Sequence, residues 1–183
     1  LALADTIKPG AADAITALHA QNLTTVLLTG DSPAAGARIA AELGIERVHA
    51  GVAPAQKADV VRELQAAGEK VAMVGDGIND AIALATADLG LALVSGTDIA
   101  LKAADIILVR DDLHVIPDAI AISRKTLRTI RTNLGWAFGY NIAAIPIAAA
   151  GFLNPLIAAA AMSLSSVLVV YNSLRIQRVR STR

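Results

Sequence analysis

A short apolar run that ends in a loop of glycines and carboxylates constrains this chain more than any other feature. Residues 71–74 are all apolar and predict a short buried strand. The loop that follows, Gly75-Asp76-Gly77-Ile78-Asn79-Asp80, has two glycines that allow a tight turn. Open α/β sheets bind ligands at the carboxyl ends of their strands, and Mg²⁺ prefers a few carboxylates together with phosphate. An Asx-rich turn is the plain alternative, but the complete GDGxND pattern favours a site for Mg²⁺ and phosphate.

Strand and helix patterns alternate along residues 1–112. Apolar runs predict strands at 1–4, 26–28, 71–74, 89–93 and 106–109, with a short extended piece at 48–52. Proline, serine or threonine start signals and glycine stop signals predict helices between these strands, at about 9–20, 33–44, 54–68, 79–86 and 97–103. The alternation favours an α/β fold, a Rossmann-like parallel sheet with helices on both faces.

A long stretch without charge follows this region. From Thr132 to Leu174 no residue is charged, and only Asn154-Pro155 separates residues 134–153 from 155–171. Each stretch approaches the ~20 residues that cross a bilayer as a helix. We therefore expect a transmembrane hairpin over 132–174, with a basic connecting helix at 113–131 before it and a basic tail at 175–183 after it. A buried helical pair of a soluble domain is the alternative.

The net charge of zero hides a strong asymmetry. All 16 acidic residues lie within 1–118, whereas eight of the 16 basic residues flank the expected hairpin. By the positive-inside rule, both ends of the hairpin are expected on the cytoplasmic side. Basic runs also bind nucleic acids, but beside an uncharged stretch lipid head groups are the simpler partner. The chain has no cysteine, which excludes disulfides and thiolate metal sites within it.

Residues suited to phosphoryl transfer occur at strand ends and helix starts. Thr29 ends the strand at 26–28, Lys57 lies at the start of the helix from Pro54, and Asp76 follows the strand at 71–74. A hydroxyl, a cation and a Mg²⁺-binding carboxylate are the groups that position and neutralise a transferring phosphoryl group. Singly, each has an ordinary structural interpretation as a turn residue, a solvated lysine or a cap. Their order along the chain favours the joint interpretation.

That order resembles the haloacid dehalogenase superfamily and, with the hairpin, the P-type ATPases. Thr29-Gly30-Asp31 resembles their TGD motif, Pro54-x-x-Lys57 their lysine motif, and residues 74–80 their hinge signature. Gly96-Thr97-Asp98 is similar to a later motif of the heavy-metal branch. The resemblance implies that Asp76 and Asp80 form the Mg²⁺ site and that Lys57 pairs with the phosphoryl group. It also implies that Asp80 holds Lys57 and that Thr29 and Asn79 contact phosphate oxygens.

The hairpin resembles the last two spans of copper(I) exporters. Residues 133–141 and 162–166 carry this likeness, which implies a transported-metal site of Tyr140, Asn141, Met162 and Ser166. A methionine thioether is a soft ligand that suits Cu(I), although methionine also fills gaps in cores and serines also join helices. Zinc and cadmium pumps carry a lysine and an aspartate in these spans. This hairpin has neither, which favours Cu(I) or Ag(I).

The resemblance implies a piece of a larger machine. The phosphorylated aspartate of a DKTGT motif, the nucleotide-binding and actuator domains and a Cys-Pro-Cys span do not occur in this sequence. We therefore expect part of an ATP-driven, Mg²⁺-dependent copper(I) or silver(I) exporter of the plasma membrane, inactive alone and dependent on the rest of the pump. Two alternatives stay open: a membrane-tethered phosphatase that uses Asp5, and a non-catalytic relic or regulatory partner.

Overall fold

The computed structural model describes residues 7–95, 97–110, 112–152 and 154–174. The elements, in chain order, are α1 (Ala11–Ala20), β1 (Val26–Leu28), α2 (Pro33–Leu43), β2 (Arg47–His49), α3 (Pro54–Ala66), β3 (Ala72–Gly75), a 3₁₀ turn η1 (Ile78–Asp80), α4 (Ala81–Thr86), β4 (Leu89–Leu93), α5 (Asp98–Ala103), β5 (Ile106–Leu108), α6 (Val115–Ala149) and α7 (Pro155–Leu174). They form two compact units, residues 1–117 and 118–183.

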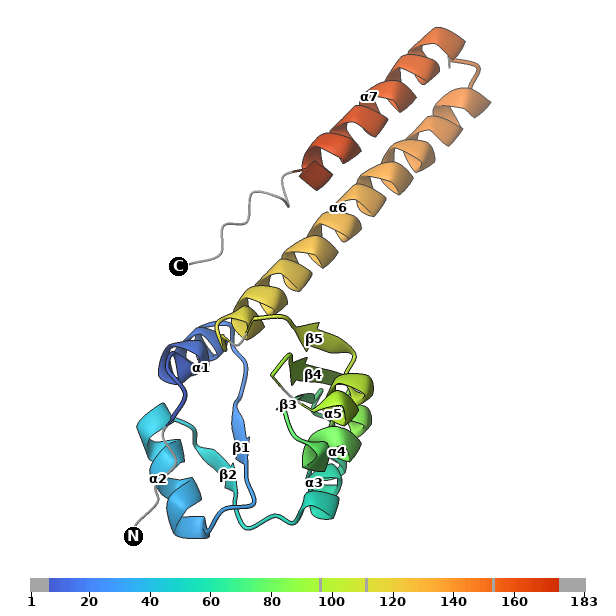
Figure 1. Cartoon of the computed structure of the whole chain (residues 1–183). Coiled ribbons are helices and arrows are strands. Elements are labelled where there is room, and N and C mark those ends of the chain that lie inside the picture. Colours follow the sequence, from blue (N-terminus) through green and yellow to red (C-terminus); the bar gives the residue numbers. More distant parts are fainter. Residues whose placement is uncertain (1–6, 96, 111, 153, 175–183) are drawn as a thin grey trace. The chain divides into compact units, whose positions relative to one another are not determined.

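The strands of the first unit are all parallel, as the alternation predicts (Figure 1). They form two sheets rather than one: β1 pairs with β2, and β4 lies between β3 and β5. Met73 is in register with Gly90, and Ala92 with Ile107. Within the described residues, no strand joins β1 to β3, so each keeps one edge without a strand partner.

Local capping signals place the helices where the sequence predicts them. The Ser32 hydroxyl accepts a hydrogen bond from the Ala35 amide at 3.3 Å, and Pro33 begins α2. The helix ends at Gly44, whose φ of 69° is in the left-handed region that glycine adopts at no steric cost. In the same way, the Thr97 hydroxyl accepts from the Ala100 amide at the start of α5.

The core of the first unit lies between β4 and α4. Leu84, Leu91 and Ala92 are almost completely buried there. A Cβ at Gly90 would lie 2.7 Å from the Leu84 carbonyl oxygen, so the close approach of α4 to β4 requires a glycine at this position. This packing supports the carboxyl end of the neighbouring strand β3, from which the GDGIND loop leaves.

The strand predicted at residues 71–74 is confirmed, but the prediction that its side chains are buried is wrong. Strand β3 forms, but Val74 is 37% exposed, and Ala72 on the same face is exposed as well. Side chains of a strand alternate between its two faces, and Met73, on the other face, is only half-buried. The described residues therefore leave one face of β3 open, and the apolar composition of the strand does not reveal this.

The second unit consists mainly of two helices that run side by side (Figure 1). Helix α6 continues without a break from Val115 to Ala149. It therefore joins the predicted connecting helix at 113–131 and the first helix of the predicted hairpin into one. The half-buried residues on its later part recur at intervals of three and four, as do those of α7, so each helix presents one stripe to the other. The two stripes are Asn133, Ala137, Tyr140 and Ala144 on α6, and Ser165, Val169 and Asn172 on α7.

A short turn joins the two helices, as predicted. The Asn154 side-chain oxygen accepts a hydrogen bond from the Leu156 amide at 2.9 Å and so caps the start of α7. Across the described residues, no helix is both long enough and apolar enough to qualify as a membrane span. The expected strand at 1–4, Gly96 and the basic tail at 175–183 lie outside the described residues.

Candidate active site and hairpin pocket

Lys57 and Asp80 form an ion pair at the end of β3. The Lys57 Nζ donates to Asp80 Oδ1 at 2.7 Å, and the two side chains are only 15% and 11% exposed. Lys57 lies in the first turn of α3, which begins at Pro54 and is closed by a hydrogen bond from the Ala53 amide to the Gln56 side chain. A charge that is largely removed from water needs such a partner, and the ion pair supplies one to each of these two side chains.

The glycines of the GDGIND loop hold Asp80 in this position. The Asp80 amide donates to the Gly77 carbonyl at 3.0 Å, and the Gly77 amide faces Asp80 Oδ2 at 3.4 Å. A Cβ at Gly75 would lie 2.7 Å from the Asp80 Cβ. The chain can therefore fold back over the end of β3 only because residue 75 has no side chain.

The Thr29-Gly30-Asp31 motif forms a second polar group at the end of β1. The Thr29 hydroxyl donates to Asp31 Oδ2 at 3.0 Å and accepts from the Asp31 amide at 3.1 Å. Backbone hydrogen bonds from Gly51 to Asp31 and from Val52 to Thr29 fix this turn against the loop after β2. Within the described residues, no hydrogen bond or ion pair joins this group directly to Lys57 or Asp80.

Asp76 and Asn79 are exposed at the same strand end as the Lys57–Asp80 pair. The Thr97 amide donates to the Asp76 carbonyl at 2.9 Å and so ties the loop before α5 to the GDGIND loop. No cluster of three or more acidic or histidine side chains that could hold a metal occurs in the part of the chain that the structure describes. Because Asp80 is occupied by Lys57, Asp76 is the loop carboxylate that stays accessible, and one or two carboxylates with phosphate oxygens suffice for Mg²⁺.

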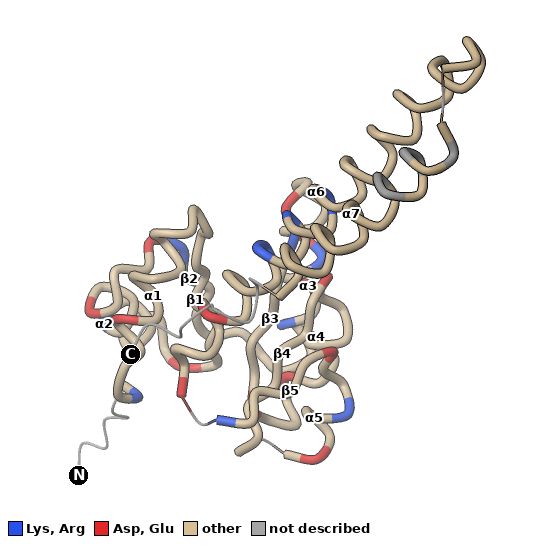
Figure 2. Tube along the Cα trace, turned by 90° about the horizontal axis from the view of Figure 1, so that it is seen from above, with Lys and Arg blue, Asp and Glu red and all other residues tan. Residues whose placement is uncertain are grey.

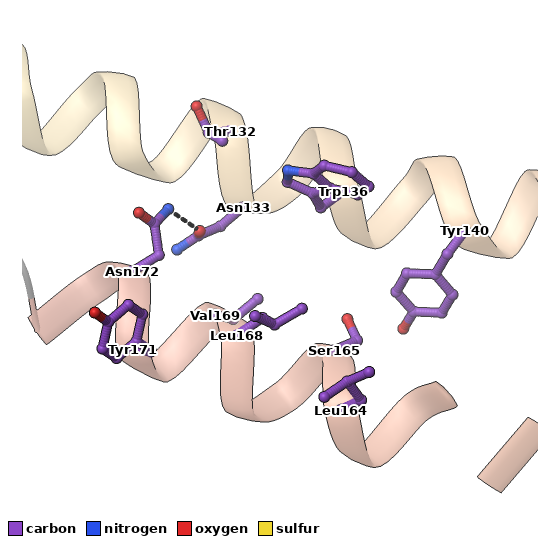
Figure 3. A pocket seen from close by; sticks show the side chains of 10 residues that line it. All are labelled: Thr132, Asn133, Trp136, Tyr140, Leu164, Ser165, Leu168, Val169, Tyr171 and Asn172. Atoms are coloured by element: carbon purple, nitrogen blue, oxygen red, sulfur yellow. Dashed lines mark hydrogen bonds between the residues drawn. The ribbon is translucent and has the colours of Figure 1, made fainter. Parts of the chain in front are cut away.

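A pocket of about 450 Å³ lies between α6 and α7 (Figure 3). Of the four predicted metal-contacting residues, only Tyr140 lines it, together with Ser165 rather than Ser166. The Asn141 amide and the Ser166 hydroxyl donate to carbonyls of their own helices, at 2.7 and 3.0 Å. Met162 is 60% exposed. Within the described residues, no hydrogen bond joins the side chains of any two of these four residues.

Three polar residues without a predicted role link the two helices. The Asn172 amide donates to Asn133 Oδ1 at 2.7 Å, the hydrogen bond drawn in Figure 3. The Asn133 amide donates in turn to the Ser173 hydroxyl at 3.1 Å. Uncharged polar residues in an otherwise apolar stretch were the signal that could have identified this cluster.

Another polar cluster of the first unit lies where β3 and β4 begin. Hydrogen bonds from Lys70, the Val71 amide and Gln65 hold the pKa of the Asp88 carboxyl far below its usual range. The hydrogen bond between Lys70 and Asp88, together with the negative charge of Asp88, raises the pKa of Lys70. These groups lie at the strand ends opposite the GDGIND loop, so their role is to fasten β3 to β4.

Comparisons with known proteins identify relatives of this chain. A family model for haloacid dehalogenase-like hydrolases matches residues 1–88. A copper-exporting P-type ATPase of Mycobacterium leprae is 58% identical over 97% of this chain and 23% of the relative. The cation-transporting P-type ATPase B of Mycobacterium tuberculosis H37Rv is 59% identical over 97% of this chain and 24% of the relative. The chain belongs to the P-type ATPase family.

The likeness extends to solved structures of this family. The crystal structure of a zinc-transporting PIB-type ATPase in its E2.Pi state aligns with a TM-score of 0.87 and 40% identity, and covers 95% of this chain and 28% of that one. The match includes the helical hairpin as well as the α/β unit, because neither alone makes up 95% of the chain. The chain spans about a quarter of the length of the curated P-type ATPases it matches. Asp5, the nucleophile of the phosphatase alternative, and Gly96 lie outside the described residues.

Proposed function

We propose that this chain is the carboxyl-terminal part of an ATP-driven, Mg²⁺-dependent P-type pump that exports Cu(I) or Ag(I). The observation that carries the proposal is the Lys57–Asp80 pair at 2.7 Å, shielded from water at the end of β3 beside the accessible Asp76. Transfer of a phosphoryl group depends on positioned positive charge. Lys57 supplies that charge, and Asp80 fixes where it is placed.

Asp76 is the residue that would hold Mg²⁺ in this proposal. The bound ion would neutralise charge on the phosphoryl oxygens. The Asp76 carboxylate is exposed at the carboxyl end of β3, and its backbone carbonyl is fixed by Thr97. Asn79, exposed on the same loop, and Thr29, with Gly30 and Asp31 at the end of β1, would contact phosphate oxygens. The hydroxyl of Thr29 would have to leave Asp31 to do so.

The rest of the same pump is the proposed partner of the first unit. The open edges of β1 and β3 and the exposed face around Val74 are places where a further strand would bury apolar surface. The phosphorylated aspartate, which this sequence does not contain in a DKTGT motif, would come from that part of the protein, as would the nucleotide-binding domain.

The hairpin is proposed to lie in the plasma membrane with both ends in the cytoplasm. Its outer surface is apolar, with Phe138, Ile142 and Ile145 all more than half exposed, and Figure 2 shows no acidic or basic residue along its length. Tyr140, Asn141, Met162 and Ser166 are the proposed contacts of the transported metal. The Met162 thioether, with no carboxylate in the hairpin, favours a soft monovalent ion such as Cu(I).

Export by the full-length protein tests this proposal. Combining Met162→Ala with Tyr140→Phe should abolish ATP-dependent copper uptake into inverted vesicles, while Val167→Ala, an exposed α7 residue outside the proposed contacts, should leave it intact. Unchanged copper transport by the double variant would overturn the cargo assignment. The coding DNA upstream of Leu1 gives an independent check, because the proposal requires an in-frame DKTGT motif and a Cys-Pro-Cys span there.

A further inference from the structure

Tyr140 and Ser165 face each other across the pocket between α6 and α7. Both side chains line this pocket and are half-buried. In Figure 3 the Tyr140 ring reaches from α6 towards α7, and the Ser165 hydroxyl points from α7 into the same space. The rest of the lining is mainly apolar and includes Trp136, Leu164 and Leu168. The pocket therefore presents one hydroxyl group from each helix within a mostly apolar wall.

Ser165 lacks the hydrogen bond that its neighbouring serines make. The Ser163 and Ser166 hydroxyls donate to carbonyls of their own helix, both at 3.0 Å. Within the part of the chain that the structure describes, no hydrogen bond joins the Ser165 hydroxyl, or that of Tyr140 across the pocket, to another group. A hydroxyl in apolar surroundings costs free energy unless it is hydrogen-bonded, and the interior of a membrane holds no water to supply the bond. A polar ligand in the pocket would meet this need.

The amide cluster of Asn133, Asn172 and Ser173 fixes which residues of the two helices meet. Tyr140 follows Asn133 by seven residues, and Asn172 follows Ser165 by seven. Seven residues are about two turns of a helix. Because α6 and α7 run antiparallel (Figure 1), the register that brings the two asparagines into contact also brings Tyr140 to Ser165. A shift of α7 by one turn, about 5.4 Å, would break the 2.7 Å hydrogen bond between the asparagines and separate the two hydroxyls.

We propose that Ser165 is a further contact of the transported cation, opposite Tyr140, and that the amide cluster positions these two residues. The inference rests on the proposed export of Cu(I) or Ag(I) and adds a fifth residue to the four proposed contacts. Met162, three residues before Ser165, would supply the soft thioether, whereas the two hydroxyls would turn oxygen lone pairs towards the ion. The amide cluster would not touch the ion and would act through the register of the two helices.

The absence of cysteine from the sequence allows the register to be measured directly. Ala137 and Val169, half-buried on the facing stripes between the two polar pairs, are replaced by cysteines in the full chain and joined by a short bifunctional thiol reagent in detergent micelles. We expect efficient cross-linking, and a loss of about threefold or more when Asn172→Ala is added, because one interhelical hydrogen bond is broken. Adding Ser163→Ala, at an exposed residue bonded within its own helix, should leave the yield unchanged. Equal yields with and without Asn172→Ala would overturn the positioning role.

Copper uptake by the full-length protein tests the contact itself. In inverted vesicles, Ser165→Ala should raise the KM for Cu(I) by about tenfold, because a contact to a charged ligand is lost, while the maximal rate stays near that of wild type. Ser165→Thr keeps the hydroxyl and should retain the wild-type KM, which a purely steric role of the small serine would not allow. Asn172→Ala should also raise the KM. Ser163→Ala, the matched serine control, should leave both KM and maximal rate unchanged.

Failure of the Ser165 contact and failure of the proposed function give different results. Absence of ATP-dependent copper uptake by the wild-type protein would overturn both. Uptake that is lost on combining Met162→Ala with Tyr140→Phe, but that keeps its KM in Ser165→Ala, would leave the proposed function standing and overturn the Ser165 contact. A KM raised equally by Ser165→Ala and by Ser165→Thr would also overturn this contact, because the shape of the side chain and not its hydroxyl would then decide.

Discussion

The ammonium group of Lys57 lies 2.7 Å from the Asp80 carboxylate, and both side chains are largely shielded from solvent. Removing one partner of a buried ion pair leaves the other charge without compensation, at a cost of about 3–5 kcal/mol. We therefore predict that Lys57→Ala lowers the free energy of unfolding of the first unit by an amount in this range. Urea denaturation of the purified chain, followed by circular dichroism, measures the change.

An exposed ion pair provides the control for this prediction. Arg62 contacts Asp59 at 2.6 Å, but both side chains are more than half exposed. Arg62→Ala should therefore cost less than about 1 kcal/mol. Equal effects of the two substitutions would mean that the Lys57–Asp80 pair is not shielded as the structure describes.

Gly75 and Gly77 should differ sharply in their tolerance of a side chain. A Cβ at Gly75 would lie 2.7 Å from the Asp80 Cβ, whereas a Cβ at Gly77 would meet Asp80 Oδ2 only at 3.6 Å, an ordinary contact. We predict that Gly75→Ala destabilises the first unit by about 1–3 kcal/mol, as overpacking does, and that Gly77→Ala costs less than about 1 kcal/mol. The urea concentrations at the unfolding midpoints of the two variants measure this difference. A Gly75→Ala variant as stable as wild type would contradict the loop geometry.

The Asp88 cluster should make the first unit sensitive to acid. Because its folded-state pKa is lowered, Asp88 stabilises the fold fully above its ordinary value of 3.8, and the stabilisation is lost as the pH falls through the lower folded-state pKa. Lys70 acts in the opposite sense: its raised pKa gives stability that is present below 10.5 and lost as the pH rises through the folded-state value.

Thermal melts between pH 2 and 7 test the acid side of this behaviour. Asp88→Asn should flatten the decline in melting temperature below pH 4, while Asp59→Asn, which removes an exposed carboxylate paired within α3, should leave the decline as in wild type. Identical profiles of wild type and Asp88→Asn would show that the cluster does not contribute.

The amide cluster between α6 and α7 should hold the hairpin together. Asn172→Ala removes the 2.7 Å hydrogen bond to Asn133, and hydrogen bonds between helices in a membrane are worth about 0.6–2 kcal/mol. Asn141→Ala is the matched control, because the Asn141 amide donates to a carbonyl of its own helix. Unfolding by dodecyl sulfate in mixed micelles, followed by Trp136 fluorescence, should show a loss in this range for Asn172→Ala and a smaller one for Asn141→Ala.

Signals confined to a few neighbouring residues were predictable from the sequence. Ser32-Pro33 and Gly44 bound α2 because a cap and a left-handed glycine act within one turn. The glycines around Asp76 likewise indicate a tight loop after β3, and the structure has one there. The parallel α/β architecture follows from the order of such local signals.

Features that depend on distant segments were not predictable in the same way. The apolar composition of β3 indicates burial, yet Val74 is exposed because no described segment covers that face. The pairing of Asn133 with Asn172 depends on the register of α6 against α7, which the sequence of either helix leaves open. The division of the strands into two sheets, with Thr29 and Asp31 after β1 and Asp80 after β3, also depends on distant segments.

Formation of a phosphoenzyme by the full-length protein is the most direct test of the role of Asp76 and Lys57 in phosphoryl transfer. The protein would be incubated with radiolabelled ATP and Mg²⁺, with and without Cu(I), and acid-stable label would be measured for wild type, Asp76→Asn and Lys57→Ala, with Arg62→Ala as control. We predict Cu(I)-dependent label in wild type and the control, and a loss of at least tenfold in Asp76→Asn and Lys57→Ala. Full labelling of both site variants would contradict the assignment of this loop to phosphoryl transfer.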